Sequence, residues 1–356
     1  MDTRTLITLT FIGGILLGGI ALAIYASLKL FNVPPSDSQL TKNLNVYSDL
    51  IKPAPIGCPN EFTLCDYYMA ASGSSILPKN TVYTYVTTES LSKVVRGGAR
   101  LVELFVYSVN KIPVVGLANK KTGKMTTYNT VKLEDCCVML ANTIFSADAT
   151  IGYKNPFVLS LVFQTNDNAF LNQCAEVLKT TLRKFMLDSS YSYQRKNLAL
   201  EPICDLMGKL IIVSGENIKG NGMDELVNMS WSSSNMRRLT YSQASQTYDI
   251  DELIEYNKRN ITLVVPDLDT TTFENKNPEI CYSYGCQWVA MAYGSLDNAM
   301  EVYTGKFLES SFAVKPEILR YKPLTYEKPK PQDPALSFQP KRMTSPMFDY
   351  TIAGVK

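Results

Sequence analysis

Residues 157–163 read FVLSLVF, an apolar run in which Ser160 is the only polar residue. A run of this length suits a strand, and a strand without apolar–polar alternation is expected to be buried on both faces. Residues 168–186 follow with apolar side chains at helical spacing, so a helix should cover this strand. Because buried strands that alternate with helices are typical of parallel sheets, the stretch predicts an α/β fold.

The same alternation extends in both directions along the chain. With 356 residues, of which 46% are hydrophobic, the chain can bury one large core. We therefore predict a (β/α) barrel in two halves. The other expected strands are residues 81–85, 100–106, 209–213, 262–265 and 287–293, and the other expected helices are residues 90–97, 131–144 and 251–258.

A patch of small residues interrupts the first strand-like run. Tyr67–Leu77 reads YYMAASGSSIL, and the residues from Ala70 to Ser75 are all Ala, Gly or Ser. Small residues gather where the backbone turns sharply or approaches a ligand closely. This patch therefore predicts the mouth of a binding or catalytic site.

The composition excludes several classes of function. The chain contains no histidine, which is the usual general acid or base near neutral pH and the commonest metal ligand. Any mechanism that depends on histidine is therefore excluded. The net charge is only +2 and no basic stripe with interleaved aromatic residues precedes the C-terminal tail, so nucleic acid is not an expected partner.

The eight cysteines indicate buried thiols rather than a zinc site. They lie far apart, form no CxxC pair and have no histidine to complete a mixed site. Disulfide bonds remain possible if the domain lies outside the cytosol. In that case Cys58 and Cys65 are the nearest candidate pair. In that orientation Asn228 and Asn260, each the first residue of a sequon, would be glycosylation sites.

The N-terminus carries a long apolar segment. Leu6–Leu28 has 23 residues without a charge, which span about 34 Å as a helix. A cleavable signal peptide is the alternative, but its apolar core would be about 7–15 residues long. We therefore predict a single-pass transmembrane anchor in residues 1–30, inserted in a lipid bilayer, and a polar connector in residues 31–58. The flanking charges do not fix the side of the membrane on which the following domain lies.

Two further segments are expected outside the barrel core. Residues 216–236 are rich in Gly, Asn and Ser and predict a surface linker between the two halves. Residues 323–356 contain six prolines and predict an extended C-terminal arm. Within this arm, SPMFDYTIAGV at residues 345–355 is apolar enough to dock on the same domain or on a protein partner.

Five blocks of the sequence resemble, in the same order, the X and Y halves of phosphoinositide-specific phospholipase C. They are YYMAASGSSIL at residues 67–77, RGGARLVEL at 96–104, NPFVLSLVF at 155–163, DLMGKLIIVSG at 205–215 and YSYGCQWVAMAYGSLDNAMEVYTGKFLESSFAVKPEILR at 282–320. The last block is the most specific, and the resemblance covers about residues 60–322. It implies the family's distorted TIM barrel, with an X-like half at 59–215 and a Y-like half at 237–322.

The resemblance also implies which positions would carry the family's chemistry. Gly73 stands where the family has a catalytic histidine, and Ser74 stands where it has a calcium-binding asparagine. A second catalytic histidine is expected close to Ala118, and none occurs there. The family reaction needs a base for the inositol hydroxyl proton, and an acid and a cation for the phosphoryl charge. These substitutions therefore predict a degenerate site.

Most calcium ligands implied by the resemblance are absent as well. Glu103 matches one ligand, whereas Phe105 and Val162 stand at two other ligand positions. A single carboxylate cannot hold a hard divalent cation, which needs about 6–8 oxygen donors. We therefore expect no metal and no cofactor. The simplest role for Glu103 is an ion pair with Arg100, Arg96 or a lysine.

The resemblance also implies that binding of a phosphoinositide headgroup is unfavourable. Ser214 replaces a lysine that contacts phosphate in the family, and the expected arginine is absent from residues 267–278. Basic side chains that would pair with phosphate groups are therefore missing from the places where a headgroup binder needs them.

Three functional hypotheses follow. The leading one is a membrane-anchored, catalytically inactive phospholipase C-like pseudoenzyme that acts as a binding, scaffolding or structural protein. The alternative is an active phosphodiesterase or lyase on phosphoinositide-type lipids, with Glu103, Asp135 or Tyr128 in place of histidine. The third is a structural component of a membrane-bounded particle such as a virion.

Overall fold

The computed structural model describes residues 2–31, 41, 62–79, 81–119, 122, 124–150, 152–215, 218–267, 272–322 and 340–352. The chain divides into two compact units, Met1–Tyr321 and Lys322–Lys356. Most of the connector expected at residues 31–58, and the arm residues 323–339, lie outside the described residues.

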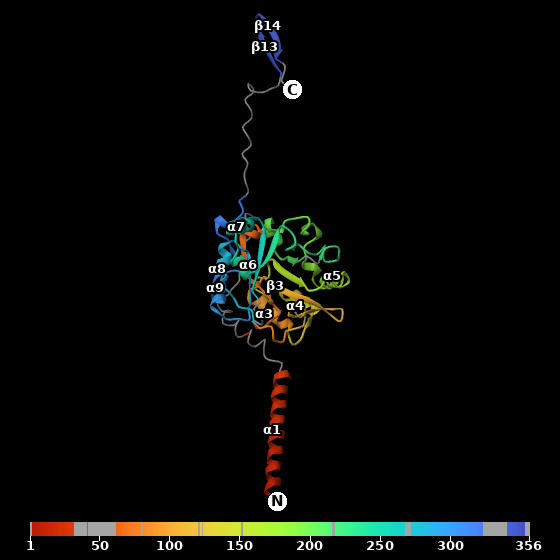
Figure 1. Cartoon of the computed structure of the whole chain (residues 1–356). Coiled ribbons are helices and arrows are strands. Elements are labelled where there is room, and N and C mark those ends of the chain that lie inside the picture. Colours follow the sequence, from red (N-terminus) through yellow and green to blue (C-terminus); the bar gives the residue numbers. More distant parts are fainter. Residues whose placement is uncertain are drawn as a thin grey trace. The chain divides into compact units, whose positions relative to one another are not determined.

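Eight parallel strands form a nearly closed barrel in the first unit (Figure 1). Neighbouring strands follow the order β8-β7-β6-β3-β2-β11-β10-β9, and each pair in this order is parallel. No ladder joins β8 to β9 among the described residues. The strands are β2 (Ala71–Ser72), β3 (Leu101–Val109), β6 (Phe157–Phe163), β7 (Leu210–Ser214), β8 (Met229–Ser230), β9 (Met236–Thr240), β10 (Ile261–Val265) and β11 (Trp288–Met291). The predicted α/β barrel of distorted TIM type is therefore confirmed.

Side chains from alternate positions of each strand fill the barrel interior. On β3, Leu101, Glu103 and Phe105 face inward, whereas Val102 and Leu104 pack against the surrounding helices. This alternation follows from the two-residue period of a strand. Because helices cover the outer faces, both faces of the central strands are buried, as the apolar run FVLSLVF predicted.

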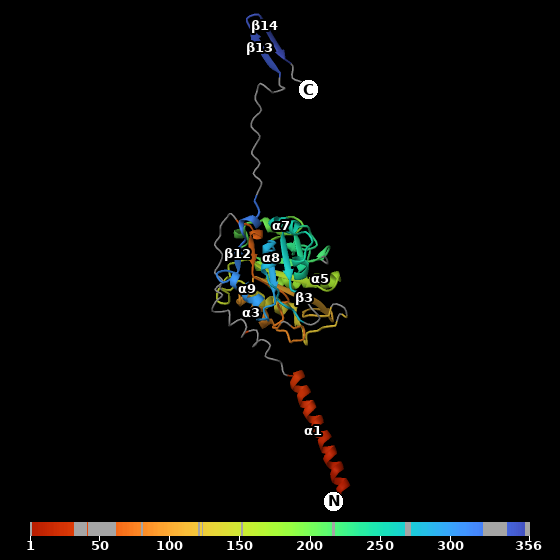
Figure 2. The ribbon, with the colours of Figure 1, turned by 60° about the vertical axis from the view of Figure 1, so that its left-hand side comes forward.

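Helices surround the barrel and cover the outward faces of its strands (Figure 2). Asp167, Asp249 and Asp297 precede three of these helices and accept hydrogen bonds from backbone N–H groups of the first turn at 3.0, 2.9 and 2.8 Å. Such caps satisfy N–H groups that have no partner within the helix. The helices are α3 (Thr88–Arg96), α4 (Leu133–Thr143), α5 (Asn168–Leu182), α6 (Tyr241–Ser245), α7 (Ile250–Arg259), α8 (Glu279–Ser283) and α9 (Asn298–Lys306), and the 3₁₀ turns are η1 (Leu64–Asp66), η2 (Arg183–Phe185), η3 (Ser189–Tyr191), η4 (Leu198–Leu200), η5 (Ile203–Leu206) and η7 (Glu317–Leu319).

Two smaller strand pairings complete the first unit. β1 (Tyr67–Met69) pairs antiparallel with β12 (Phe312–Val314), which joins the two ends of the barrel sequence. β4 (Ile112–Val115) folds back on β3 and pairs with β5 (Val131–Lys132). This last pairing explains why α4 begins at Leu133 rather than at residue 131, where the helix was expected.

Two predicted segments differ in the structure. Residues 81–85 form bends instead of a strand, with one isolated bridge from Thr81 to Thr272. The described part of residues 216–236 is more than a surface linker, because it contributes β8 to the barrel and buries Met229 and Ser230. Both errors arose because local composition does not report which residues a segment contacts in the folded chain.

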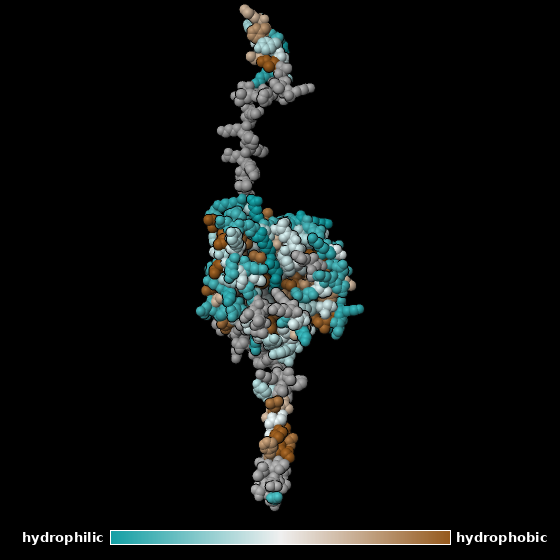
Figure 3. Space-filling view, in the orientation of Figure 1, coloured by the Kyte–Doolittle hydropathy of each residue, from teal (hydrophilic) through white to brown (hydrophobic). Residues whose placement is uncertain are grey.

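The N-terminal apolar segment forms the helix α1 (Thr3–Phe31). Phe11, Leu17 and Leu22 on this helix are exposed, and Figure 3 shows the hydrophobic colouring there. Among the described residues, however, no helix is both long enough and apolar enough to cross a membrane. The helix is therefore present, and the insertion of Leu6–Leu28 in a lipid bilayer stays a prediction.

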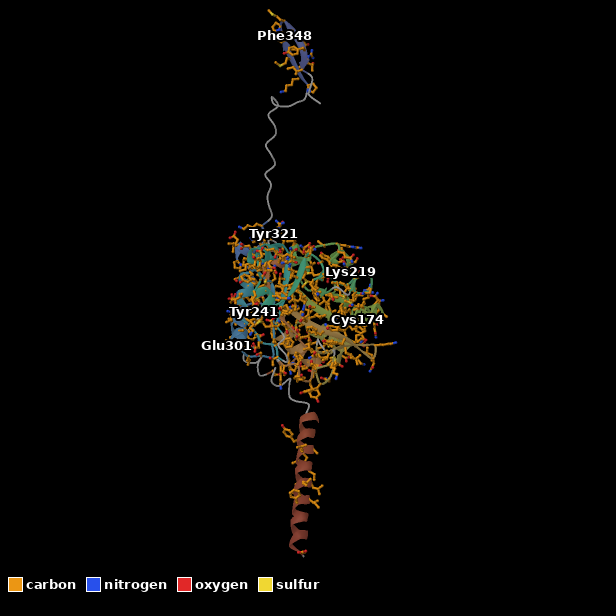
Figure 4. The ribbon with its side chains drawn as sticks, viewed as in Figure 1. Cys174, Lys219, Tyr241, Glu301, Tyr321 and Phe348 are labelled. Carbon is orange, nitrogen blue, oxygen red and sulfur yellow. The ribbon has the colours of Figure 1, made fainter. Side chains whose placement is uncertain are left out.

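The second unit is a two-stranded antiparallel hairpin of β13 (Lys341–Ser345) and β14 (Phe348–Ile352). The sequence predicted an extended arm here and missed this pairing. Phe348, labelled in Figure 4, lies with its ring centroid 5.6 Å from that of Tyr350. The apolar run noted at residues 345–355 thus supplies the whole of β14.

Six cysteines are free and buried, as the composition indicated: Cys65, Cys136, Cys137, Cys174, Cys281 and Cys286. Because the Cys65 thiol is free, the candidate pair of Cys58 and Cys65 is wrong; Cys58 itself lies outside the described residues. Cys204 is disulfide-bonded.

The first sequon is not accessible for glycosylation in this fold. Asn228 is only 3% exposed, its side-chain oxygen accepts from Ile212 N at 2.8 Å, and its amide donates to Tyr191 O at 3.3 Å. A glycan on this nitrogen would break both the burial and the amide hydrogen bond. Asn260 is partly exposed, so the second sequon remains a candidate glycosylation site.

Candidate functional site

A cavity of about 510 Å³ opens at the carboxyl ends of the barrel strands. This is the end at which TIM barrels carry their active sites, because loops after the strands converge there. The described residues that line the cavity are Ser74, Val82, Glu103, Phe105, Tyr107, Leu117, Ala118, Asn119, Thr126, Gln164, Arg238, Thr240, Val265, Pro266, Asp267 and Phe273. The sequence-predicted positions Ser74, Glu103, Phe105 and Ala118 are therefore brought together around one space.

Glu103 forms an ion pair with Arg238 across the barrel. The carboxylate oxygen Oε1 accepts a hydrogen bond from Nε of Arg238 at 2.8 Å, and Nη2 of Arg238 lies 2.7 Å from the same oxygen. The Glu103 side chain is 1% exposed and that of Arg238 is 20% exposed. The guanidinium also lies 5.6 Å from the centroid of the Trp231 ring, which limits its freedom to leave the carboxylate. Glu103 is therefore occupied by an internal cation.

The partners expected for Glu103 are elsewhere. Arg100 is fully buried and donates to the backbone oxygens of Ile144, Asn155 and Pro156 at 3.1, 2.7 and 3.3 Å. Burial lowers the pKa of Arg100 to about 9. The predicted pairing of Glu103 with Arg100, Arg96 or a lysine is thus wrong, because Arg238 is the partner instead.

The alternation of β9 explains why Arg238 faces inward. Its neighbour Arg237 points outward and forms two hydrogen bonds with Glu252 of α7 at 2.8 and 2.6 Å. Successive residues of a strand point to opposite faces, so only one of two adjacent arginines can enter the barrel. The sequence Met236-Arg237-Arg238-Leu239 predicts an inward-facing Arg238 only if residue 236 is recognised as the start of a strand rather than the end of a linker.

The residues at the ligand positions implied by the resemblance do not fit calcium. Phe105 of β3 and Val162 of β6 are register partners and place apolar side chains where the resemblance implied carboxylates. Glu103 is held by Arg238, and Asp267 accepts from the Ser242 hydroxyl at 2.6 Å and from Ser242 N at 3.1 Å. Within the described ranges, no group of three or more Cys, Asp or Glu side chains is placed to hold a metal ion. This donor set does not match the oxygen-rich shell that a hard divalent cation requires.

Gly73 lies directly behind the cavity, where a larger residue cannot be placed. A Cβ atom on Gly73 would lie 2.7 Å from Cδ of Pro266 and 3.5 Å from Cβ of Ala290. The first distance is shorter than real carbon contacts, so any side chain here must displace the proline ring. The tight patch predicted from the sequence is therefore close-packed as well as small.

The turn after Gly73 fixes the backbone of Glu103. Ser74 adopts a left-handed conformation with φ of 49°. Ser75 donates from its backbone N–H to Glu103 O at 3.1 Å, and its hydroxyl accepts from Glu103 N at 3.0 Å. Strain at a non-glycine residue in this region persists only where such contacts hold it. The turn thus positions the retained carboxylate.

Ala118 lines the same cavity and follows β4 in sequence. Its backbone N–H donates to the Tyr107 hydroxyl at 3.0 Å, and burial raises the pKa of Tyr107. Asp135 on α4 and Tyr128 are exposed and are not among the described residues that line the cavity. The alternative chemistry that relied on these two residues therefore has no shared site with Glu103.

The two halves of this barrel match two domain families of known proteins. Residues 61–215 match the family described as phosphatidylinositol-specific phospholipase C, X domain, and residues 210–318 match the corresponding Y domain. The crystal structure of L. pealei PLC21 is 19% identical, with a TM-score of 0.63 over 75% of this chain and 39% of that chain. The structure of S. officinalis PLC21 is 20% identical, with a TM-score of 0.63 over 75% of this chain and 38% of that chain. At this identity the two structures show a shared fold.

Curated relatives match a shorter stretch. The 1-phosphatidylinositol 4,5-bisphosphate phosphodiesterase beta-1 of Bos taurus is 31% identical over 72 residues, which are 19% of this chain and 6% of that protein. The beta-4 protein of Homo sapiens is 30% identical over 79 residues, or 21% and 7% of the two chains. The chain thus spans a small part of these relatives. Taken with the X and Y domains and the barrel, these matches show that the chain belongs to the phosphoinositide-specific phospholipase C family.

Proposed function

We propose that this protein is a catalytically inactive phospholipase C-like pseudoenzyme that serves as a binding or scaffolding protein. The observation that carries this proposal is the ion pair between Glu103 and Arg238. In this arrangement the Arg238 guanidinium is paired with the Glu103 carboxylate, which would otherwise be available to help bind a metal ion. A guanidinium bound to Glu103 carries a single charge and cannot supply the Lewis-acid chemistry of a divalent metal ion at this carboxylate.

The remaining residues of the cavity support the same proposal. Cleavage of a phosphodiester needs a base to take the attacking proton, and donors or cations to stabilise the phosphoryl charge. Glu103 is held by Arg238, Asp267 is held by Ser242, and the chain has no histidine. Loss of the base alone reduces a rate by about 10²–10⁴, and loss of one charge-stabilising donor by about 10²–10³.

Turnover of phosphatidylinositol tests the proposal. The purified full chain is mixed with phosphatidylinositol vesicles and calcium, and released inositol phosphate is measured beside an active phospholipase C as a positive control. We expect no release above background. Release that Glu103→Ala abolishes, while Glu252→Ala leaves it unchanged, would contradict the proposal and favour an enzyme with non-histidine chemistry.

The C-terminal hairpin supports a scaffolding role. An isolated two-stranded hairpin is marginally stable in water, so a partner is expected to cover it. Met343, Phe348 and Tyr350 share one face and are exposed, whereas Arg342 and Asp349 form an ion pair on the other face. We propose this apolar face as the contact with a protein partner.

Matched substitutions on the two faces of the hairpin test this contact. Phe348→Asp should abolish cross-linking of the hairpin to its partner in the native cell. Thr351→Asp adds the same charge beside Arg342 on the polar face and should leave cross-linking unchanged. Equal loss in both variants would argue against an apolar contact.

A structural role in a membrane-bounded particle such as a virion is the narrower form of this proposal. It requires many copies of the protein in purified particles, which quantitative mass spectrometry can count. Copies dispersed in cell membranes and absent from particles would contradict it.

A further inference from the structure

The cavity at the carboxyl ends of the strands has the size of a small-molecule site. Its volume of about 510 Å³ falls within the range of about 300–1,000 Å³ that is typical of ligand pockets. The chemistry of its walls therefore indicates which class of ligand it can accept. This question rests on the proposed function, because an active enzyme would need a lipid phosphate in the same space.

The charges on the walls disfavour an anion. The charged side chains among the described lining residues are Glu103, Arg238 and Asp267. Arg238 is neutralised by Glu103, and Asp267 accepts hydrogen bonds from the neutral Ser242. The described lining residues thus carry one net negative charge, which repels an anionic group more strongly in a partly buried site than in water.

The other described lining residues carry no charge, and many of them are apolar. Val82, Phe105, Leu117, Val265 and Phe273 face the same space. Among the polar groups, the Ser74 hydroxyl belongs to a residue that is only 5% exposed, and it makes no hydrogen bond to another described residue. A hydroxyl that lines a cavity and has no protein partner can donate a hydrogen bond to a ligand or accept one from it.

We propose that the cavity binds an uncharged amphiphile, a molecule with an apolar body and a single hydrogen-bonding group directed to Ser74. The apolar walls hold the body, and the Glu103–Arg238 pair removes the cation that an anionic headgroup would need. The pair therefore sets the specificity of the site. The ion pair excludes phosphorylated headgroups, but it leaves the cavity large enough for an uncharged ligand.

Two dyes with one skeleton test the charge selectivity. N-phenylnaphthylamine is uncharged, and anilinonaphthalene sulfonate adds a sulfonate to the same rings. Fluorescence titration of the full chain should give one site for the uncharged dye. We expect the uncharged dye to bind at least about tenfold more tightly than the sulfonate. Equal affinities, or tighter binding of the sulfonate, would overturn the proposal.

Removal of the Glu103 charge should reduce this preference for the uncharged dye. Glu103→Gln leaves Arg238 with its charge uncompensated, so the affinity for the sulfonate dye should rise about tenfold, while that for the uncharged dye changes less than about twofold. Glu252→Gln is the matched control, since it releases the adjacent Arg237 on the outer face of the same strand. An equal rise in the control would overturn the assignment to the cavity.

A cavity-filling variant locates the dye. Ala118→Trp places an indole in the cavity and should abolish binding of the uncharged dye, whereas Val302→Trp, on the exposed face of α9, should not. Circular dichroism of each variant confirms folding, and if Ala118→Trp fails to fold, Val82→Trp fills the same space.

The outcomes separate this inference from the proposed function. Dye binding that survives in a folded cavity-filled variant would be binding to exposed apolar surface, such as α1, and would overturn the inference. No dye binding together with no phosphatidylinositol turnover would overturn this inference alone. Turnover would overturn the proposed function whether or not the dyes bind.

Discussion

Arg238 of β9 donates a hydrogen bond from Nε to Oε1 of Glu103 on β3 at 2.8 Å, and its Nη2 lies 2.7 Å from the same oxygen, although 135 residues separate the two in sequence. Removing one member of a buried pair leaves the other charge without compensation. This relationship links the stability of the barrel to the chemistry of its cavity.

The ion pair should dominate the stability of the cavity. Arg238→Ala is expected to lower the free energy of unfolding by about 3 kcal/mol, because Glu103 is 1% exposed and would remain buried without a partner. Arg237→Ala removes an outward ion pair whose members are 37% and 48% exposed, so its cost should be about 0–1 kcal/mol. Urea unfolding of both variants checks the difference, and equal costs would contradict it.

Restoring a histidine at the family position should not restore activity. A side chain on Gly73 meets Pro266 at 2.7 Å, so Gly73→Ala should already lower the unfolding free energy by about 1–3 kcal/mol. Gly73→His should lower it further and yield no phosphatidylinositol turnover. Gly305→Ala, on α9 with no atom within 4 Å of the added Cβ, is the control and should be neutral or stabilising by about 1 kcal/mol. A stable, active Gly73→His protein would refute this prediction.

Lys315 should give the barrel a measurable pH dependence. Its ammonium group is buried and donates to Cys65 O at 3.0 Å and Asn257 O at 2.9 Å, and burial lowers its pKa from 10.5 to about 8. Between these two values the unfolded chain binds a proton that the folded chain does not, so this residue makes stability rise with pH across pH 8 to 10.5. The rise should reach about 3 kcal/mol at most.

The measurement compares the wild type with Lys315→Met across this pH range. The buried thiols oppose the effect, since burial raises the pKa of Cys65 to about 11 and that of Cys286 to about 12. Both thiols are present in both proteins, so their contributions largely cancel in the difference. A difference in unfolding free energy that stays constant from pH 8 to 10.5 would show that the buried amine does not change its protonation.

The C-terminal unit should be dispensable for the barrel. Residues up to Tyr321 form one compact unit, so a chain that ends at Lys322 should keep its Tm within about 2 °C of the full chain. A chain that ends at Ser311 loses β12 and Lys315 and should be far less stable, because β12 pairs with β1. Differential scanning calorimetry checks both, and a large fall in Tm for the chain that ends at Lys322 would show that the hairpin contributes to the barrel.

The sequence by itself determined the type of fold and the absence of histidine chemistry. The apolar run Phe157–Phe163 and the helices around it predicted a parallel sheet covered on both faces, because the helices that connect parallel strands bury both faces of such a sheet. The blocks that resemble the X and Y halves then fixed the barrel. Gly73 and Ser74 could be recognised as a tight turn from their residue types alone.

Only the tertiary structure decided the partner of Glu103 and the role of the intervening segments. Residue periodicity is a local signal, whereas the inward position of Arg238 depends on barrel closure and strand register. The same reason explains why residues 229–230 have the composition of a linker yet form a strand, and why the contact between Gly73 and Pro266 could not be predicted. Local patterns select the elements, but contacts between distant strands decide what the site can bind.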